Sequence, residues 1–313
     1  MLTVRRFDWV FVLSLFLWIL SWSLFPAPAL SDDRVVSLPD GSIYKGEIDC
    51  DGMMSGHGLL LWWTGAVYEG EFKDGLKHGI GKYTDVDGYS AEGVFERGVI
   101  SEGTVSLADG SVLIGNFRKG VLYGDATIMY PDGALYQGIV RNGVPNGLGV
   151  YFGSDGYLSF GDFVEGVVDG SAVISYPSGN IYDGEVCDGV EEGRGVFIMK
   201  SGDVVKGEFD DGVMNGLARV EYSSGGYFEG RFVRGVKSGY GVLVYPDGDR
   251  YEGDFEGDAM NGIGVFYMSN GSRYKGEFLD GQFHGQGVYY RQGSGEIMSG
   301  CFRYGEYVGV ECE

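Results

Sequence analysis

Apolar and polar residues alternate along most of this chain with a period of two. That period predicts β-strands, because successive side chains of a strand point to opposite faces of a sheet. In the segment Tyr251-Glu252-Gly253-Asp254-Phe255 the rings and the glycine share one face, and the two acids share the other. A second apolar stretch follows each such segment after a short gap that contains glycine. The pattern therefore predicts an all-β chain built from pairs of short strands.

The alternating segment recurs at a nearly constant step. Its clearest copies start at Tyr68, Phe228, Tyr251 and Tyr274, and weaker copies start at Tyr44, Ala91, Leu113, Tyr136, Ser159, Tyr182, Val205 and Met298. The twelve starts lie 22 to 24 residues apart, a regularity that chance does not produce. The chain is thus read as eleven full units of about 23 residues and one truncated unit at the C-terminus. The units at Ala91, Leu113 and Ser159 lack the first aromatic ring.

Glycines mark fixed positions inside each unit. One follows at position eight, as Gly75 and Gly235 do, and many units close on Asp-Gly or Asn-Gly, such as Asp87-Gly88. These dipeptides favour two-residue hairpin turns, because both central residues can take a positive φ. Each unit is therefore predicted to run strand, short loop, strand, tight turn, with the tight turn at the closing dipeptide.

The spacing also predicts how neighbouring strands pack. Positions one, three and five share a face with positions twelve, fourteen and sixteen of the next strand, such as Gly239, Gly241 and Leu243. On that face, rings of one strand can lie over bare glycine backbone of another, so we expect these glycines to be packing partners. The opposite face carries charges on the first strand and is often apolar on the second, as at Val242 and Val244.

The pattern Tyr-x-Gly-x-Phe, then Gly, then Gly-x-Gly at a step of 23 residues resembles the MORN repeat (membrane occupation and recognition nexus). The resemblance covers residues 44–313. Its signature positions here, all with a structural role, are Tyr44, Gly46, Tyr68, Gly70, Phe72, Tyr136, Gly138, Tyr182, Gly184, Phe228, Gly230, Tyr251, Gly253, Phe255, Tyr274, Gly276 and Phe278. The family implies an elongated, single-layer, twisted solenoid of consecutive antiparallel β-hairpins. With strands about 4.8 Å apart and two strands per unit, eleven units span on the order of 100 Å.

The first residues of the chain have the features of an export signal. Arg5 and Arg6 precede an uncharged apolar run over residues 9–25, and Ala27-Pro28-Ala29 follows it. Such a segment is typical of a signal peptide cleaved after Ala29. Its 17 residues also fall within the range of an uncleaved membrane anchor, so both alternatives remain open.

Either alternative predicts an N-terminal hydrophobic helix and a protein that is exported (periplasmic, secreted or in the secretory pathway) or anchored to a membrane. The predicted division is 1–29 for the signal peptide or anchor, 30–43 for a short linker and first turn, and 44–313 for the solenoid.

Composition excludes several classes of protein. The chain has 58 glycines but no Gly-X-Y triplet repeat, which excludes collagen, and its 22 tyrosines and 19 phenylalanines argue against disorder. The formal net charge of −22 disfavours nucleic acid and anionic lipid as partners and favours cationic ones.

Residues with catalytic or metal-binding chemistry are sparse. His78 and His284 occupy the position that Asn215 has in another unit, and we interpret them as turn residues; His57 has no Cys or His at metal-ligand spacing. Acids at position four of successive units, such as Glu71, would lie about 10 Å apart, too far to share one metal ion. The sequence therefore predicts no catalytic residue, no cofactor and no metal site.

The four cysteines fall into two groups. Cys50 and Cys187 are six units apart, about 55–60 Å along the solenoid, and cannot pair within one chain. Cys301 and Cys312 stand at positions four and fifteen of the last unit, near opposite points of one hairpin. They are the candidate disulfide of an exported protein, with two reduced thiols as the alternative.

These observations predict a non-enzymatic scaffold or adaptor that presents an extended β face to protein partners. A second copy of the chain, in a homodimer, is one of the partners considered. The alternative is a peripheral membrane or phospholipid-binding module that tethers a complex at a membrane, which the resemblance implies and the net charge disfavours. Enzymes of the family carry a separate kinase or SET domain beside the repeats, and no segment of this chain matches one.

Overall fold

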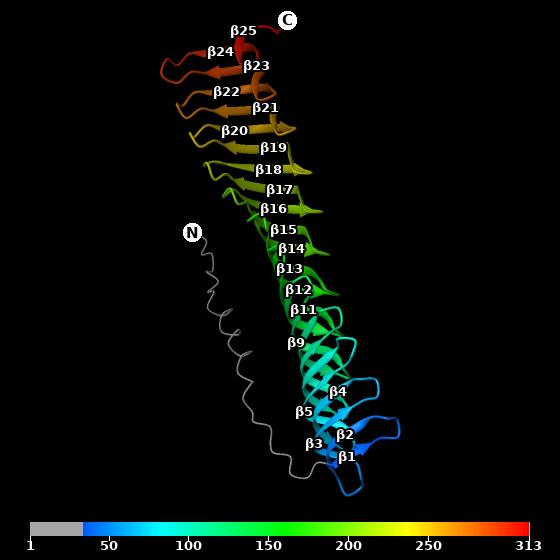
Figure 1. The fold of residues 1–313 in the computed structure, drawn as a ribbon. Coiled ribbons are helices and arrows are strands. Elements are labelled where there is room, and N and C mark those ends of the chain that lie inside the picture. Colours follow the sequence, from blue (N-terminus) through cyan, green and yellow to red (C-terminus); the bar gives the residue numbers. More distant parts are fainter. Residues whose placement is uncertain (1–33, 313) are drawn as a thin grey trace.

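The structure, a computed structural model, describes residues 34–312. Over this range the chain is all-β and forms one antiparallel sheet of 25 strands. Each strand pairs with its neighbours in the sequence, so that the strands succeed one another in chain order from β1 to β25 along an elongated, progressively twisted sheet (Figure 1). The predicted all-β solenoid of consecutive hairpins is confirmed.

The bounds of the strands are as follows. They are β1 Arg34–Ser37, β2 Ile43–Ile48, β3 Met54–Leu61, β4 Val67–Lys73, β5 Leu76–Thr84, β6 Ser90–Glu96, β7 Val99–Ser106, β8 Val112–Arg118, β9 Val121–Met129, β10 Leu135–Arg141, β11 Val144–Phe152, β12 Leu158–Val164, β13 Val167–Ser175, β14 Ile181–Cys187, β15 Val190–Ile198, β16 Val204–Asp210, β17 Val213–Glu221, β18 Tyr227–Val233, β19 Val236–Val244, β20 Arg250–Glu256, β21 Ala259–Tyr267, β22 Arg273–Leu279, β23 Gln282–Tyr290, β24 Ile297–Arg303 and β25 Glu306–Gly309.

The N-terminal predictions meet the structure only in part. The hydrophobic helix expected within residues 1–29 lies outside the described residues. In the segment predicted as linker and first turn, residues 34–37 form β1, which pairs with β2 through Val36 opposite Tyr44, and a turn follows. The sheet therefore begins ahead of the first repeat unit. Within residues 34–312 no helix has the length and apolarity needed to cross a membrane.

The tight turns lie at the opposite end of the hairpins from the predicted one. Asp74 and Gly75 join β4 to β5 with φ values of 53° and 76°, which is the two-residue turn with both residues in the left-handed region. At Asp87-Gly88 only the glycine has a positive φ, and the Asp85 N–H donates to the Tyr89 carbonyl at 3.0 Å, which closes a loop of three residues. The prediction of a two-residue turn at the closing dipeptides is thus wrong.

The Asp85 side chain explains the difference. Its carboxylate accepts the N–H groups of Asp87 (3.0 Å) and Tyr89 (2.9 Å), which stabilises a type I turn with aspartate in the first position. A type I turn followed by a left-handed glycine makes a three-residue hairpin loop. The Asp-Gly dipeptide alone does not distinguish the two kinds of turn.

Every full hairpin also contains an irregularity in register. In β4 and β5, Gly70 lies opposite Gly81, but the next residue, Glu71, lies opposite His78, so β5 accommodates two extra residues there. The Glu71 carboxylate accepts the Ile80 N–H at 3.1 Å. Similar bonds join Glu208 to Leu217, Asp254 to Ile263 and Glu277 to Gln286. The acids at position four therefore cap the bulges instead of forming a ladder of metal ligands.

His78 and His284 lie at these bulges, inside β5 and β23. Their interpretation as turn residues is wrong, because the turn precedes them by two residues or more and the bulge provides the irregular backbone.

The core is a row of rings packed on glycine. Tyr68 is fully buried, and its ring lies so close to Gly81 that a Cβ there would be 2.2 Å from the hydroxyl. The hydroxyl donates to the carbonyls of Glu71 (3.1 Å) and His78 (3.2 Å) at the bulge. The role of these glycines as packing partners is confirmed.

Phenylalanines at position five link one unit to the next. The Phe72 ring lies edge-on to Tyr68 of its own unit, at 5.1 Å, and to Tyr44 of the preceding unit, at 5.2 Å. Edge-to-face pairs at this distance are favourable for aromatic rings. The rings join the other buried residues into one core cluster that extends from Tyr44 to Phe302 along one face of the sheet, here called the core face. The opposite side is called the outer face.

Candidate interaction surfaces

A second row of rings lies on the core face beside the buried one. We call Tyr130, Tyr151, Tyr157, Tyr176 and Phe197 the aromatic row. Consecutive ring centroids are 6.0–6.2 Å apart, and all five side chains are half-buried and pack against the core cluster. They come from the strand ends and loops between β9 and β15. The row is a continuous strip of aromatic surface.

The phenols of the aromatic row are held neutral. Burial raises the pKa of Tyr130, Tyr151, Tyr157 and Tyr176 above the ordinary value, and nearby carboxylates and tyrosines raise it further. The Tyr176 hydroxyl donates to the Glu191 carboxylate. The row can therefore offer hydroxyl groups and flat apolar rings to a ligand at any physiological pH.

The residue at position ten of a unit is a lysine in some units and apolar in others. In the central units it holds buried apolar residues, among them Ile100, Leu122 and Val168. The flanking units have Lys77 and Lys237 there. The Lys77 ammonium lies 4.3 Å from the Tyr83 ring centroid and 5.2 Å from that of Phe95, and burial lowers its pKa. The central part of the core face thus lacks the cations that its flanks carry.

The outer face has its own apolar region, over β10–β13. We call Leu135, Val150, Phe152, Leu158, Phe160 and Val173 the outer panel. They are cross-strand neighbours: Phe160 lies opposite both Val150 and Val173, and Phe152 lies opposite both Leu135 and Leu158. Charged groups flank this panel, with Lys82 and Glu92 paired at 3.0 Å on one side. Arg219 bridges Glu221 (3.1 Å) and Glu229 (2.8 Å) on the other.

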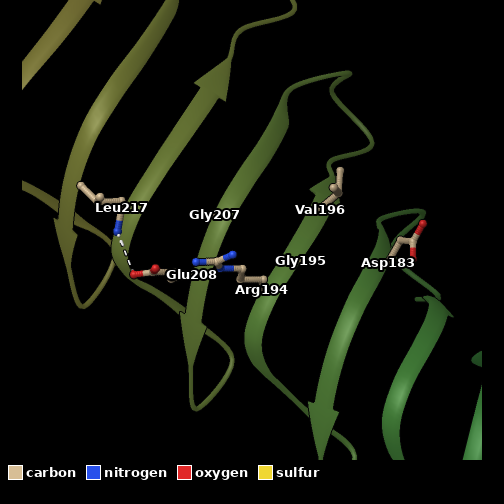
Figure 2. Close-up of a pocket in the computed structure, with 7 residues that line it drawn as sticks. All are labelled: Asp183, Arg194, Gly195, Val196, Gly207, Glu208 and Leu217. Atoms are coloured by element: carbon tan, nitrogen blue, oxygen red, sulfur yellow. Dashed lines mark hydrogen bonds between the residues drawn. The ribbon is translucent and has the colours of Figure 1, made fainter. Parts of the chain in front are cut away.

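A shallow depression of about 560 Å³ lies on the outer face next to the panel. Figure 2 shows its lining, which is Asp183, Arg194, Gly195, Val196, Gly207, Glu208 and Leu217. Arg194 and Glu208 are directly opposite one another on β15 and β16, and the Glu208 carboxylate accepts the Leu217 N–H at 3.2 Å. The lining therefore has two acids and one cation, and the Glu208 carboxylate is already hydrogen-bonded to the backbone.

A second depression of about 460 Å³ lies on the same face nearer the C-terminus. Its lining is Val265, Tyr267, Arg273, Lys275, Val288, Tyr290 and Ile297, from β21–β24.

Metal-binding side chains do not cluster within residues 34–312. In this range no set of three or more His, Cys, Asp or Glu side chains could hold a metal ion. His284 packs edge-on to Tyr304 at 5.4 Å, and its buried Nδ1 has no hydrogen-bond partner among the described residues. Glu277 lies directly opposite His284 in the register, and its carboxylate accepts the Gln286 N–H at 3.1 Å.

The cysteines are placed as the repeat spacing requires. Cys301 on β24 and Cys312 beyond β25 form a disulfide, and Cys50 and Cys187 are exposed free thiols. The Gln286 side-chain amide donates to the Cys312 sulfur at 3.4 Å, which places the last residues over β23 on the outer face.

The aromatic row and the outer panel were not among the sites predicted from sequence. The row draws its rings from positions sixteen, eighteen and twenty-two of different units, so no single motif marks it. A tyrosine at position eighteen in several units, such as Tyr130, Tyr176, Tyr222 and Tyr245, was the available signal.

Comparison with known families finds the MORN repeat. The model of the MORN repeat matches residues 68–88, 136–156, 182–204, 206–227, 228–250, 251–273 and 274–295. No matched span starts at Ala91, Leu113 or Ser159, the units that lack the first ring.

Several solved structures resemble this chain at low sequence identity. The SAS-4 (dCPAP) TCP domain of Drosophila melanogaster, in complex with a proline-rich motif of Ana2, is 12% identical over 74% of this chain and 97% of that chain, with a TM-score of 0.29. The TCP10 domain of Danio rerio CPAP, in complex with a STIL peptide, is 13% identical over 85% and 97%, with a TM-score of 0.25. Virginiamycin B lyase from Staphylococcus aureus is 10% identical over 78% and 83%, with a TM-score of 0.15. All three scores are below 0.5, so these proteins do not inform the function of this chain.

Proposed function

The chain belongs to the MORN-repeat family, and on that premise we propose that it is a non-enzymatic scaffold whose core face holds an extended segment of a protein partner. The aromatic row carries this proposal. Tyrosine supplies a large apolar contact and a hydroxyl at low cost in side-chain entropy, and it is enriched among the residues that dominate binding energy at protein interfaces.

The dimensions of the row fit a short peptide. Four ring-to-ring steps of 6.0–6.2 Å separate Tyr130 from Phe197. An extended chain rises about 3.3 Å per residue, so the row accommodates roughly seven residues. Because the phenols stay neutral, we expect apolar side chains to lie on the rings and backbone carbonyls to accept their hydroxyl hydrogens.

The test is affinity capture of the tagged full-length protein from its own cells, with envelope and soluble fractions analysed separately. We expect the wild type to recover a partner that binds the row. The amount of that partner recovered should fall at least tenfold with the double variant Tyr151→Ala/Tyr157→Ala. Tyr240→Ala is the matched control, since this exposed tyrosine lies on the outer face and leaves the row intact. Equal recovery of the same partner by the row variant would exclude the row as the docking surface.

Self-association is a second candidate, and the outer panel favours it. Two apolar sheet faces can pack against each other about 10 Å apart, and the panel has no charge to desolvate. A homodimer mass in light scattering at tens of micromolar, reduced to the monomer mass in Val150→Lys/Val173→Lys, would support it. A monomer mass for the wild type would refute it.

The apolar segment of residues 9–25 supports a place outside the cytosol. We propose that it exports the solenoid or anchors it to a membrane, so that partners are met there. The mass of the purified protein distinguishes the two, because cleavage after Ala29 removes 29 residues. A full-length mass in a soluble fraction would contradict both.

A further inference from the structure

The second depression of the outer face differs in charge from the rest of the molecule. Two of its lining residues, Arg273 and Lys275, are cationic, and none is acidic. The whole chain has a formal net charge of −22, so the charge of this lining is opposite in sign to that of the protein.

The sheet places both cations on one side of β22. Arg273 and Lys275 are two residues apart in the strand, so their Cα atoms lie about 7 Å apart and both side chains project from the outer face. The cross-strand neighbours of Arg273 are Tyr267 and Tyr290. Those of Lys275 are Val265 and Val288. Rings therefore flank the guanidinium and aliphatic groups flank the ammonium.

The nearby carboxylates are engaged elsewhere. Glu252 on β20 pairs with Arg250, and the Glu277 carboxylate accepts the Gln286 N–H at 3.1 Å. Among residues 34–312, neither Arg273 nor Lys275 forms an ion pair with a carboxylate. Two adjacent like charges repel each other, and an anion held between them would remove that repulsion.

The arginine is also oriented for an anion. Its guanidinium carbon lies 5.6 Å from the Tyr290 ring centroid, within the range of a cation–π contact. A guanidinium held against a ring keeps N–H groups at its edge available for two parallel hydrogen bonds to a carboxylate or phosphate.

We propose that this cavity binds a small organic anion: a carboxylate or phosphate monoester, contacted by Arg273 and Lys275, on an aromatic or branched aliphatic body that contacts Tyr267, Tyr290 and Ile297. The volume of about 460 Å³ lies within the range of small-molecule sites. The formal net charge of −22 disfavours extended anions such as membranes and nucleic acids, whereas a small anion contacts only the lining of this cavity.

The first depression differs from this one in the charges of its lining. There Arg194 is the one cation in the lining and lies opposite Glu208, with Asp183 also in the wall. A bound anion would have to compete with two carboxylates. Arg194 is therefore a matched control for the loss of one surface cation on the same face.

The experiment is isothermal titration of the full chain with phenyl phosphate, which joins a phosphate monoester to an aromatic ring. We expect saturable binding at one site per chain that weakens as salt is raised. Arg273→Gln/Lys275→Gln should lower the affinity at least tenfold, and Arg194→Gln should leave it within twofold of the wild type. Thermal unfolding of each variant checks that the fold is intact.

Inorganic phosphate and phosphatidylserine vesicles complete the test. Inorganic phosphate should bind at least fivefold more weakly than phenyl phosphate, because it lacks the apolar body. Equal affinity for the two would overturn the assignment of the apolar wall. Unchanged binding in the double variant, or vesicle binding without phenyl phosphate binding, would overturn the proposal as a whole.

Discussion

The contact between a tyrosine ring and bare backbone is the smallest unit that organises this protein. Tyr68 covers Gly70 of its own strand and Gly81 of the next, and its hydroxyl satisfies two carbonyls at the bulge. The chain itself varies this contact. Alanine replaces glycine at position fourteen in three of the units that start with a smaller residue: Ala126 with Leu113, Ala172 with Ser159, and Ala218 with Val205.

Gly81→Ala should therefore destabilise the protein. A Cβ at this position would lie 2.2 Å from the Tyr68 hydroxyl and 2.6 Å from a ring carbon, so the ring must move from its site. We expect a loss of about 2–3 kcal/mol, the usual cost of overpacking a close-packed core. Urea unfolding monitored by circular dichroism measures it.

Two further variants separate the ring clash from the backbone. At Gly124 the φ is +82° and no atom lies within 4 Å of an added Cβ. Gly124→Ala should therefore lower the free energy of unfolding only by the backbone strain, about 1 kcal/mol. Tyr68→Leu/Gly81→Ala should be more stable than the sum of its single changes indicates, as in the unit that starts at Leu113. Additive effects would show that the ring and the glycine are not coupled.

The buried phenols make stability sensitive to high pH. Burial, as the largest cause, raises the pKa of Tyr136, Tyr182 and Tyr274 to about 12. The unfolded chain ionises its tyrosines at about 10, so above that pH ionisation favours unfolding. The stability these groups confer is fully present below about pH 10 and is lost as pH rises toward 12. Melting temperatures measured with spectrophotometric titration of phenolate should fall in this window, and a flat profile would contradict the burial.

At the scale of the strand pair, the bulge determines the shape of each hairpin. The Glu71 carboxylate bonds to the Ile80 N–H, and its oxygen lies 2.4 Å from where a Cβ on Gly79 would be. The acid at position four thus packs over the glycine at position twelve. In another unit an apolar side chain takes the place of the carboxylate, since Ile139 packs over Gly147.

Glu71→Ala should cost about 1–2 kcal/mol, because it leaves a backbone donor without its partner. Glu69→Ala is the control on the same strand and the same outer face, and it should change stability by less than about 0.5 kcal/mol. Both are read from urea midpoints. If the two variants are equally stable, the carboxylate does not support the bulge.

Across the whole molecule, each unit contacts only its neighbours. The Gly75 N–H donates to the Met54 carbonyl at 3.0 Å, and Asp249 accepts the Ser269 N–H at 2.7 Å. Successive units are therefore joined through the turns at both ends of the strands. Such coupling makes stability a sum of local terms, and the ends open most easily. At the C-terminal end, the disulfide holds β24 and the residues after β25 together.

Cys301→Ser/Cys312→Ser should therefore loosen one end only. A closed loop of this size restricts the unfolded chain by about 3 kcal/mol. Hydrogen exchange should accelerate in β24 and β25 and remain unchanged in β10–β15. Cys50→Ser/Cys187→Ser, which removes the two exposed thiols, should change neither region. Uniform acceleration along the sheet would contradict a nearest-neighbour solenoid.

Repetition made much of the architecture predictable. The repeat step, the alternation of faces and the pairing of rings with glycines all follow from residues 22 to 24 apart, because each unit meets the same local geometry as the one before it. The position of the tight turn was wrong for a local reason: a turn dipeptide does not reveal which residue comes first in its turn. Asp85 stabilises the observed turn in one hairpin, and the same turn forms after Tyr130 without such a side chain.

The sequence by itself determined the all-β solenoid and its repeat register, because these depend on spacing along the chain. Only the tertiary structure decided which side chains act together. The aromatic row, the outer panel and the Arg273–Lys275 cavity each draw residues from different positions of several units. Cross-strand register and the bulges bring those residues side by side, and no distance along the sequence reports that.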